Sequence, residues 1–177
     1  MPTIRLATFA DIPSLDALIA RSARGLSVGD FTPEQVEAAL GDAFGVDTQL
    51  IRDGTYFAVE RDGALAACGG WSSRRTLFGA DGGREREPTR LDPATDAAKI
   101  RAFFVDPAFA RQGLGRALLR RCEAAARDAG FSRAELMATL PGLRLYASCG
   151  YIPGARVDYT LRSGVTIPFV PMAKPLR

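Results

Sequence analysis

The junction between a strand and a helix at residues 105–118 constrains the fold of this chain more than any other stretch. An apolar strand stops at Asp106, and a helix follows behind Gly113 and Gly115. Apolar side chains then recur at helical spacing as far as Ala129. The first turn of a helix has unpaired N–H groups and a partial positive charge. The junction is therefore suited to hold an anion such as a phosphate group.

Two common phosphate-binding turns do not match this junction. A P-loop needs a lysine and a hydroxyl residue after its second glycine, whereas Arg116 and Ala117 follow Gly115. A Rossmann turn needs a third glycine, and the chain has Leu118 at that position. Neither nucleotide-binding class therefore explains the two glycines.

The pattern that remains resembles the GNAT superfamily of N-acetyltransferases. The signature of that superfamily is Arg/Gln-x-x-Gly-x-Gly/Ala behind a strand that ends in Val-x-Pro, and residues 112–117 and 105–107 match it in order and spacing. Residues 145–151 are similar to its Leu-Tyr-x-x-x-Gly-Phe/Tyr segment, and residues 4–13 are similar to its first strand and helix. The resemblance covers the whole chain, and residues 100–151 are its most specific part.

The expected elements alternate as in a mixed α/β protein. Strands are predicted at 3–8, 55–60, 64–71, 97–105 and 133–140, and a terminal hairpin at 151–161 and 165–174. Helices are predicted at 11–23, 32–40, 113–129 and 142–148. The resemblance implies one domain over residues 1–177, a three-layer α/β/α fold whose mixed, mostly antiparallel sheet splays at the acetyl-CoA site.

Three details of this outline can be checked against a structure. Residues 72–95 are rich in glycine, proline and charge and are expected to form a long loop. The stretch 25–31 is a candidate lid over the acceptor. Pro168 and Pro171 indicate that the last strand is irregular or lies partly at an edge, because proline cannot donate to a β-ladder.

The resemblance also implies the co-substrate, acetyl-CoA, and the residues that hold it. Its pantetheine is expected to pair with the main chain at Phe103, Phe104 and Val105. Its pyrophosphate is expected at the turn formed by Arg111, Gln112, Gly113, Leu114, Gly115, Arg116 and Ala117.

Tyr146 matches the general acid of the superfamily. A phenol with the usual pKa near 10 is protonated at neutral pH and can donate to a departing thiolate. The alternative is that Tyr146 is a core residue of an amphipathic helical turn.

The general base and the acceptor are less defined by the sequence. Lys99 occupies the position at which several GNAT enzymes have a glutamate, so Asp96, Glu135 or a water path are the open choices for the base. By strand alternation, Lys99 and Arg101 share one face with Phe103. If that face lines the cleft, the site is cationic and favours an amine with a carboxylate or phosphate group.

The long loop adds further candidate contacts to an anionic acceptor. These candidates are Arg74, Arg75, Arg84 and Arg86. The alternative is that they belong to a solvated charged loop.

Composition excludes several other classes of function. The 177 residues include no histidine, and the three cysteines have no C-x-x-C spacing, so neither a histidine triad nor a metal site is expected. The net charge is only +3, and no stretch interleaves basic and aromatic residues, so no nucleic-acid partner is expected. No apolar run approaches the ~20 residues of a membrane span, and the first residues lack a signal peptide, so we expect a cytoplasmic protein with no membrane partner.

These observations predict a cytoplasmic, acetyl-CoA-dependent N-acetyltransferase. It is expected to acetylate a primary amine of a small metabolite by direct attack in a ternary complex. Two alternatives stay open: a non-catalytic acetyl-CoA-binding regulatory or sensor module, and an acetyltransferase of protein N-termini or lysines. A homodimer is also left open.

Overall fold

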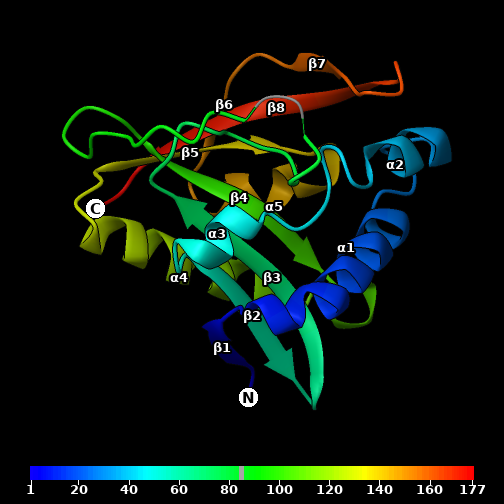
Figure 1. Cartoon of the computed structure of the whole chain (residues 1–177), viewed down its shortest axis with the longest axis horizontal. Helices are drawn as coiled ribbons and strands as arrows, with labels where there is room; N and C mark the ends of the chain where they lie inside the picture. Colours follow the sequence, from blue (N-terminus) through cyan, green and yellow to red (C-terminus); the bar gives the residue numbers. More distant parts are fainter. Residues whose placement is uncertain (84–85) are drawn as a thin grey trace.

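The computed structural model describes residues 1–83 and 86–177, and its centre is one eight-stranded sheet (Figure 1). The strand order is β1-β2-β3-β4-β5-β8-β6, and β7 pairs with β8. The strands are β1 (Thr3–Leu6), β2 (Tyr56–Arg61), β3 (Ala64–Ser72), β4 (Ala98–Val105), β5 (Arg133–Ala138), β6 (Ile152–Pro153), β7 (Val157–Thr160) and β8 (Thr166–Pro175). Neighbours are antiparallel except β4 and β5, which run parallel.

Helices cover both faces of this sheet. The α-helices are α1 (Ile12–Leu26), α2 (Pro33–Ala39), α3 (Thr48–Arg52), α4 (Leu114–Asp128) and α5 (Leu143–Ser148). In Figure 1, α1 and α3 lie in front of β2 and β3, and α4 lies behind them. Successive side chains of β2 point to opposite faces of the sheet and so contribute to both hydrophobic cores. Phe57 packs in the core with α4, whereas Tyr56 packs in the core with α1. The structure therefore confirms the predicted three-layer fold with a mixed, mostly antiparallel sheet.

Short-range sequence signals gave most element boundaries correctly. The Thr32 hydroxyl accepts from the backbone N–H of Gln35 at 3.1 Å, and the Gln35 side chain accepts from the N–H of Thr32 at 2.9 Å, so the predicted capping box begins α2. The turn between β2 and β3 has positive φ at Asp62 (52°) and Gly63 (77°), as a tight hairpin turn requires.

The start of the first helix differs from the prediction. Asp11 does not cap α1 with its side chain. A 3-10 turn (Phe9–Asp11) precedes the helix, and the Asp11 carboxylate accepts from the backbone N–H of Thr8 at 2.7 Å. Asp11 is therefore the acidic partner of a capping box that begins at Thr8.

Two other elements were not predicted as they occur. Helix α3 has five residues, too few to show a hydrophobic period, and it begins at Asp47, whose carboxylate accepts from the N–H of Gln49 at 3.1 Å. The terminal hairpin is interrupted, because β6 and β7 pair with different parts of β8. The expectation that β8 lies partly at an edge is confirmed at Pro168, which pairs only with Asp158 of β7, whereas Pro171 is opposite Met137 of β5.

The described residues of the predicted loop beyond the end of β3, 73–83 and 86–95, contain neither helix nor strand, and ion pairs hold this loop to the two ends of α3. Arg74 pairs with Asp53 at 2.6 Å, and Arg86 pairs with Asp47 at 2.9 Å. Arg84 lies outside the described residues. None of the helices in the described ranges has the length and apolar character that a bilayer crossing needs.

The Asp47 carboxylate links the loop, α3 and the sheet. It is fully buried and pairs with Arg101 of β4 at 2.5 Å as well as with Arg86. Arg101 also donates to the carbonyl of Gly79 at 2.7 Å, and Arg86 donates to the carbonyl of Ala80 at 3.0 Å. One carboxylate thereby fixes two guanidinium groups that hold the loop at residues 79–80.

We expect Asp47→Asn to destabilise the fold strongly. Arg101 is only 4% exposed, and the substitution leaves its charge buried without a partner. Removing one partner of a buried ion pair costs about 3–5 kcal/mol, so the free energy of unfolding in urea should fall by about this amount.

The matched control is Glu37→Gln. Glu37 forms an ion pair with Arg24 at 2.7 Å, but both side chains are 56% exposed, so this loss should not be measurable. Equal stabilities of the two variants would contradict the role of Asp47.

Candidate functional site

The candidate site lies where β4 and β5 part. These parallel strands pair at Ala98–Ala134 and Lys99–Glu135, and the described residues beyond make no further ladder pairs between them. The N–H of Asp106 bonds to Ala66 of β3 at 2.9 Å. Backbone groups alternate in direction along a strand, so those of Val105 point to the opposite edge, toward β5. The opening therefore exposes backbone donors and acceptors to an extended ligand.

A β-bulge shapes β4 at this opening. Phe104 is opposite Cys68, but Arg101 is opposite Gly70, so two residues of β4 face Gly69. Ala102 has a φ of 52°, and its carbonyl accepts from the buried Tyr56 hydroxyl at 3.1 Å. A Cβ on Gly69 would lie 2.4 Å from the Phe103 ring, so glycine is required there. Contacts with Tyr56 of β2 and Gly69 of β3 therefore hold the bulge in place.

The amino end of α4 lies at the mouth of the opening. Arg111 (64°) and Gly113 (81°) have positive φ, and the turn that they form has no side-chain cap on the helix. The first intrahelical bond runs from the N–H of Ala117 to Gly113 at 3.0 Å. The N–H groups of Leu114, Gly115 and Arg116 therefore have neither a backbone nor a side-chain acceptor among the described residues. Free N–H groups at the start of a helix are typical of an anion site.

Gly115 brings this helix end against the sheet. A Cβ at Gly115 would lie 3.0 Å from a methyl group of Leu145 and 3.7 Å from one of Val105. Arg116 is exposed and donates to the Ser148 hydroxyl at 3.0 Å, which links α4 to α5. The residues predicted to bind pyrophosphate and those predicted to bind pantetheine are therefore adjacent.

Helix α1 braces the turn that leads to α4. Arg21 pairs with Asp106 at 2.6 Å, and Asp106 also accepts from the N–H of Ala108 at 3.0 Å. A Cβ on Gly25 would fall 2.6 Å from a carbon of Pro107. The expected lid at 25–31 therefore begins beside this turn, and residues 43–45, not 25–31, line the cavity at the opening.

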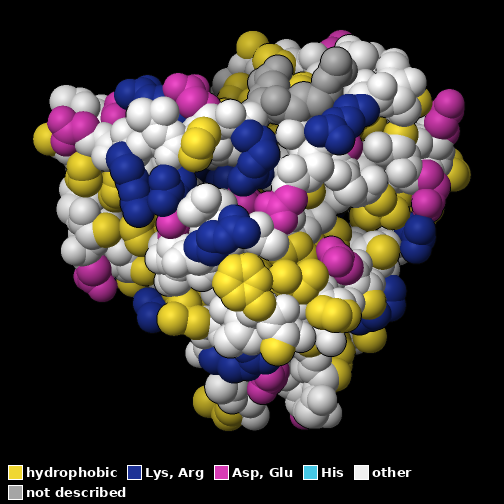
Figure 2. All heavy atoms as spheres, in the orientation of Figure 1, with side chains coloured by type: hydrophobic (Ala, Val, Ile, Leu, Met, Phe, Trp, Pro, Cys, Tyr) yellow, Lys and Arg dark blue, Asp and Glu magenta, His cyan; other side chains and the backbone are white. Residues whose placement is uncertain are grey.

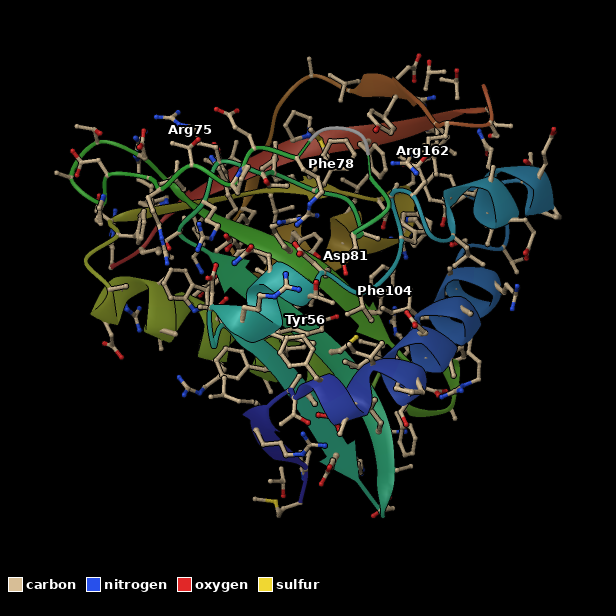
Figure 3. All side chains as sticks on the ribbon, in the orientation of Figure 1. Tyr56, Arg75, Phe78, Asp81, Phe104 and Arg162 are labelled. Atoms are coloured by element: carbon tan, nitrogen blue, oxygen red, sulfur yellow. The ribbon has the colours of Figure 1, made fainter. Side chains whose placement is uncertain are left out.

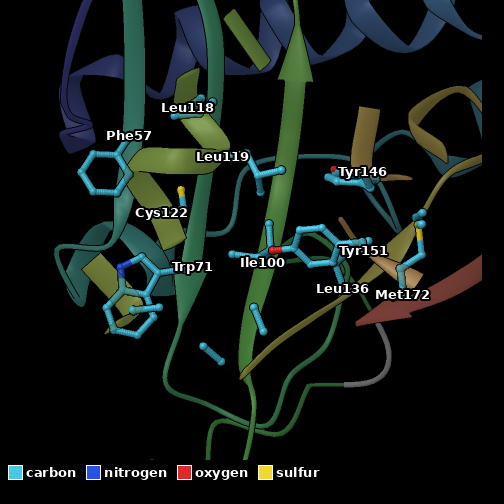
Figure 4. Packing of buried hydrophobic residues seen from close by; sticks show 14 of the residues in the cluster. Phe57, Trp71, Ile100, Leu118, Leu119, Cys122, Leu136, Tyr146, Tyr151 and Met172 are labelled. Carbon is cyan, nitrogen blue, oxygen red and sulfur yellow. The ribbon is translucent and has the colours of Figure 1, made fainter. Parts of the chain in front are cut away.

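A cavity of about 60 Å³ fills the space between the parted strands. Its walls include Phe103, Thr139 and Tyr146, and the segments 43–45 and 77–79 cover it. The Tyr146 ring meets the Phe103 ring edge-on at a centroid distance of 6.4 Å. It meets the Tyr151 ring edge-on at 5.9 Å (Figure 4). Burial raises the pKa of Tyr146, so its hydroxyl stays protonated at neutral pH.

The two basic residues predicted to line an acceptor cleft have their charges compensated. Lys99 forms an ion pair with Glu135 and lines neither of the two cavities, and burial lowers its pKa. Arg101 lines the 60 Å³ cavity, but its charge is paired with Asp47. Of the candidate bases, Glu135 is engaged by Lys99, and Asp96 accepts from the N–H of Asp92 at 2.8 Å.

A larger cavity, of about 360 Å³, was not predicted from the sequence. It lies between α1, residues 40–48 and the loop at 80–82. Two carboxylates, Asp16 and Asp81, line it, and Phe44 and Gly45 are common to both cavities. Figure 3 shows Asp81 in front of the sheet, on the side of Phe104. These segments are far apart in the sequence, and each looks like an ordinary loop or helix face by itself.

Comparisons with known proteins agree with this geometry. Residues 21–151 match the model of the Acetyltransferase (GNAT) family. A GCN5-related N-acetyltransferase from Rhodopseudomonas palustris has a TM-score of 0.72 at 18% identity, over 99% of this chain and 96% of that one. The Salmonella typhimurium protein yncA, solved with its cofactor acetyl-CoA, has a TM-score of 0.67 at 19% identity, over 100% and 95%.

A protein-modifying enzyme is similar to the chain as well. The ribosomal-protein-S18-alanine N-acetyltransferase from Escherichia coli has a TM-score of 0.60 at 20% identity, over 99% of this chain and 94% of that one. Comparison with curated protein sequences finds no match. Because the family model covers most of the chain, from within α1 to the residue before β6, the protein belongs to the GNAT family of acetyltransferases.

Proposed function

We propose that this protein transfers the acetyl group of acetyl-CoA to a primary amine of a small molecule, with residues 1–177 acting as one domain. The observation that carries the proposal is the opening between β4 and β5, with an uncapped helix end at its mouth and Tyr146 in its wall. Segments 43–45 and 77–79 cover the cavity, which favours a small acceptor over a protein segment.

The chain's own groups fit the two polar parts of the co-substrate. The free backbone edge at residues 103–105 suits the pantetheine amides. The N–H groups of Leu114, Gly115 and Arg116 suit the pyrophosphate, with the exposed side chains of Arg111 and Arg116 beside them.

Tyr146 is the proposed general acid. It donates its phenolic proton to the sulfur as the C–S bond breaks and the C–N bond to the amine forms, and it recovers a proton from solvent. The proton lost by the amine passes to water, since Glu135 and Asp96 are both engaged by other groups. The buried position of Tyr146 excludes competing solvent from the reacting atoms.

The helix-end site predicts that Gln112→Glu weakens acetyl-CoA binding. Gln112 is exposed, and a carboxylate ahead of α4 suits the helix itself but repels a pyrophosphate. The dissociation constant, measured by calorimetric titration, should rise by about tenfold or more, which corresponds to about 1.4 kcal/mol.

Gln35→Glu is the matched control, because it makes the same chemical change at the start of α2. It should leave the affinity unchanged. If the folded Gln112→Glu protein binds acetyl-CoA with wild-type affinity, the pyrophosphate does not bind at this turn.

The role of Tyr146 predicts that Tyr146→Phe lowers kcat and leaves acetyl-CoA binding intact. The ring contacts persist and only the proton donor is lost, so kcat should fall by about 100-fold. Steady-state kinetics and calorimetry on the same preparation separate the two quantities.

Tyr151→Phe provides the comparison for this variant. The Tyr151 ring touches Tyr146, but it does not line the cavity between the strands. Removal of the Tyr151 hydroxyl should leave kcat near the wild-type value. Equal kcat in the two variants would make Tyr146 a packing residue.

A further inference from the structure

The 360 Å³ cavity has the size and lining of a small-molecule site. Apolar side chains from α1 and from residues 40–46, including Ile12, Ile19 and Phe44, form most of its wall. Two carboxylates, Asp16 of α1 and Asp81 of the long loop, are its charged residues. Figure 2 shows acidic side chains near the centre of this face, with both hydrophobic and basic side chains beside them.

Backbone hydrogen bonds hold both carboxylates, Asp16 at Val46 and Asp81 at Thr48, and Asp81 also lies within electrostatic reach of the Arg101 guanidinium. Asp81 accepts from the N–H of Thr48 at 3.0 Å, and neither Asp16 nor Asp81 has an ion-pair partner among residues 1–83 and 86–177. Partial burial raises the pKa of Asp16, and the negative charge of Asp81 raises it further. A cation between them would relieve this repulsion.

Among the described residues, the lining has no positive group to receive an anion. No Lys or Arg occurs among the described residues of the wall, and Arg101, the nearest guanidinium on β4, is committed to Asp47. An acceptor with a carboxylate or phosphate would therefore meet two like charges and no partner.

The large cavity adjoins the place where the acetyl group would be transferred. Phe44 and Gly45 form a wall common to the two cavities, and Phe44 packs edge-on against Phe104 of β4 at 5.9 Å. The two cavities are therefore neighbours, with Phe44 and Gly45 between them.

We propose that this cavity binds the acceptor, and that the acceptor is an alkylamine with a second, protonated amine. Asp16 and Asp81 hold the protonated end, and Ile12, Ile19 and Phe44 pack against the alkyl chain. The free amine reaches past Phe44 and Gly45 to the reacting carbonyl. This inference rests on the proposed function, and it replaces the anionic acceptor that the sequence favoured.

The test compares three acceptors of equal length that differ at the far end: 1,6-diaminohexane, hexylamine and 6-aminohexanoate. With excess acetyl-CoA, kcat/KM should be about tenfold or more higher for the diamine than for hexylamine, and lowest for the amino acid. Asp16→Asn and Asp81→Asn should each lower the ratio of kcat/KM for the diamine to kcat/KM for hexylamine by about tenfold, mainly by raising the KM of the diamine.

Calorimetric titration of the same three amines into the protein without acetyl-CoA gives a readout that does not depend on turnover. The diamine should bind most tightly, and each asparagine variant should weaken it. Asp128→Asn removes an exposed carboxylate at the far end of α4 and should change nothing.

The outcomes distinguish the two levels of the proposal. Tighter binding or faster acetylation of 6-aminohexanoate than of the diamine would overturn the cationic acceptor and leave acetyl transfer standing. Asp-dependent binding of the diamine without any acetylation would support the cavity and count against the proposed transfer. Equal binding of all three amines, unchanged in the variants, would also overturn the inference.

Discussion

The rest of the structure depends on the parting of two parallel strands. Backbone N–H and C=O groups inside a sheet must find partners, and β4 and β5 give up that pairing after two residue pairs. The surrounding parts keep the opening stable. Tyr56 and Gly69 hold the bulge in β4, Gly115 lets α4 close on the end of the strand, and the loop fixed by Asp47 covers the gap. A ligand with its own amides can then take the place of the missing strand pairs.

The sequence was most informative where the physics is local. The capping box at Thr32, the tight turn at Gly63 and the glycines before α4 each depend on residues within a few positions of one another. Such patterns fix backbone angles and hydrogen bonds without reference to the rest of the chain. That is why most of the order of elements and the sheet class could be predicted together.

The charges of the site could not be assigned from the sequence, because their partners are distant along the chain. Arg101 forms an ion pair with Asp47, which is 54 positions earlier in the sequence. Lys99 forms an ion pair with Glu135, and these two residues lie on the parallel strands β4 and β5. Strand alternation placed both basic residues on one face but could not show that each was neutralised. The same limit applies to the larger cavity, whose walls come from α1, residues 40–48 and residues 80–82. Helix α3 was missed for a different reason, since five residues are too few to show a period.

The helix end at α4 and the larger cavity lie in different layers of the molecule. The helix end proposed for pyrophosphate belongs to α4, behind the sheet, whereas the larger cavity opens beside α1, in front of it (Figure 1). An occupant of one therefore does not cover the entrance of the other. If the two substrates bind at the places proposed above, neither needs to bind before the other, and the acetylated product can depart while the spent carrier is still bound.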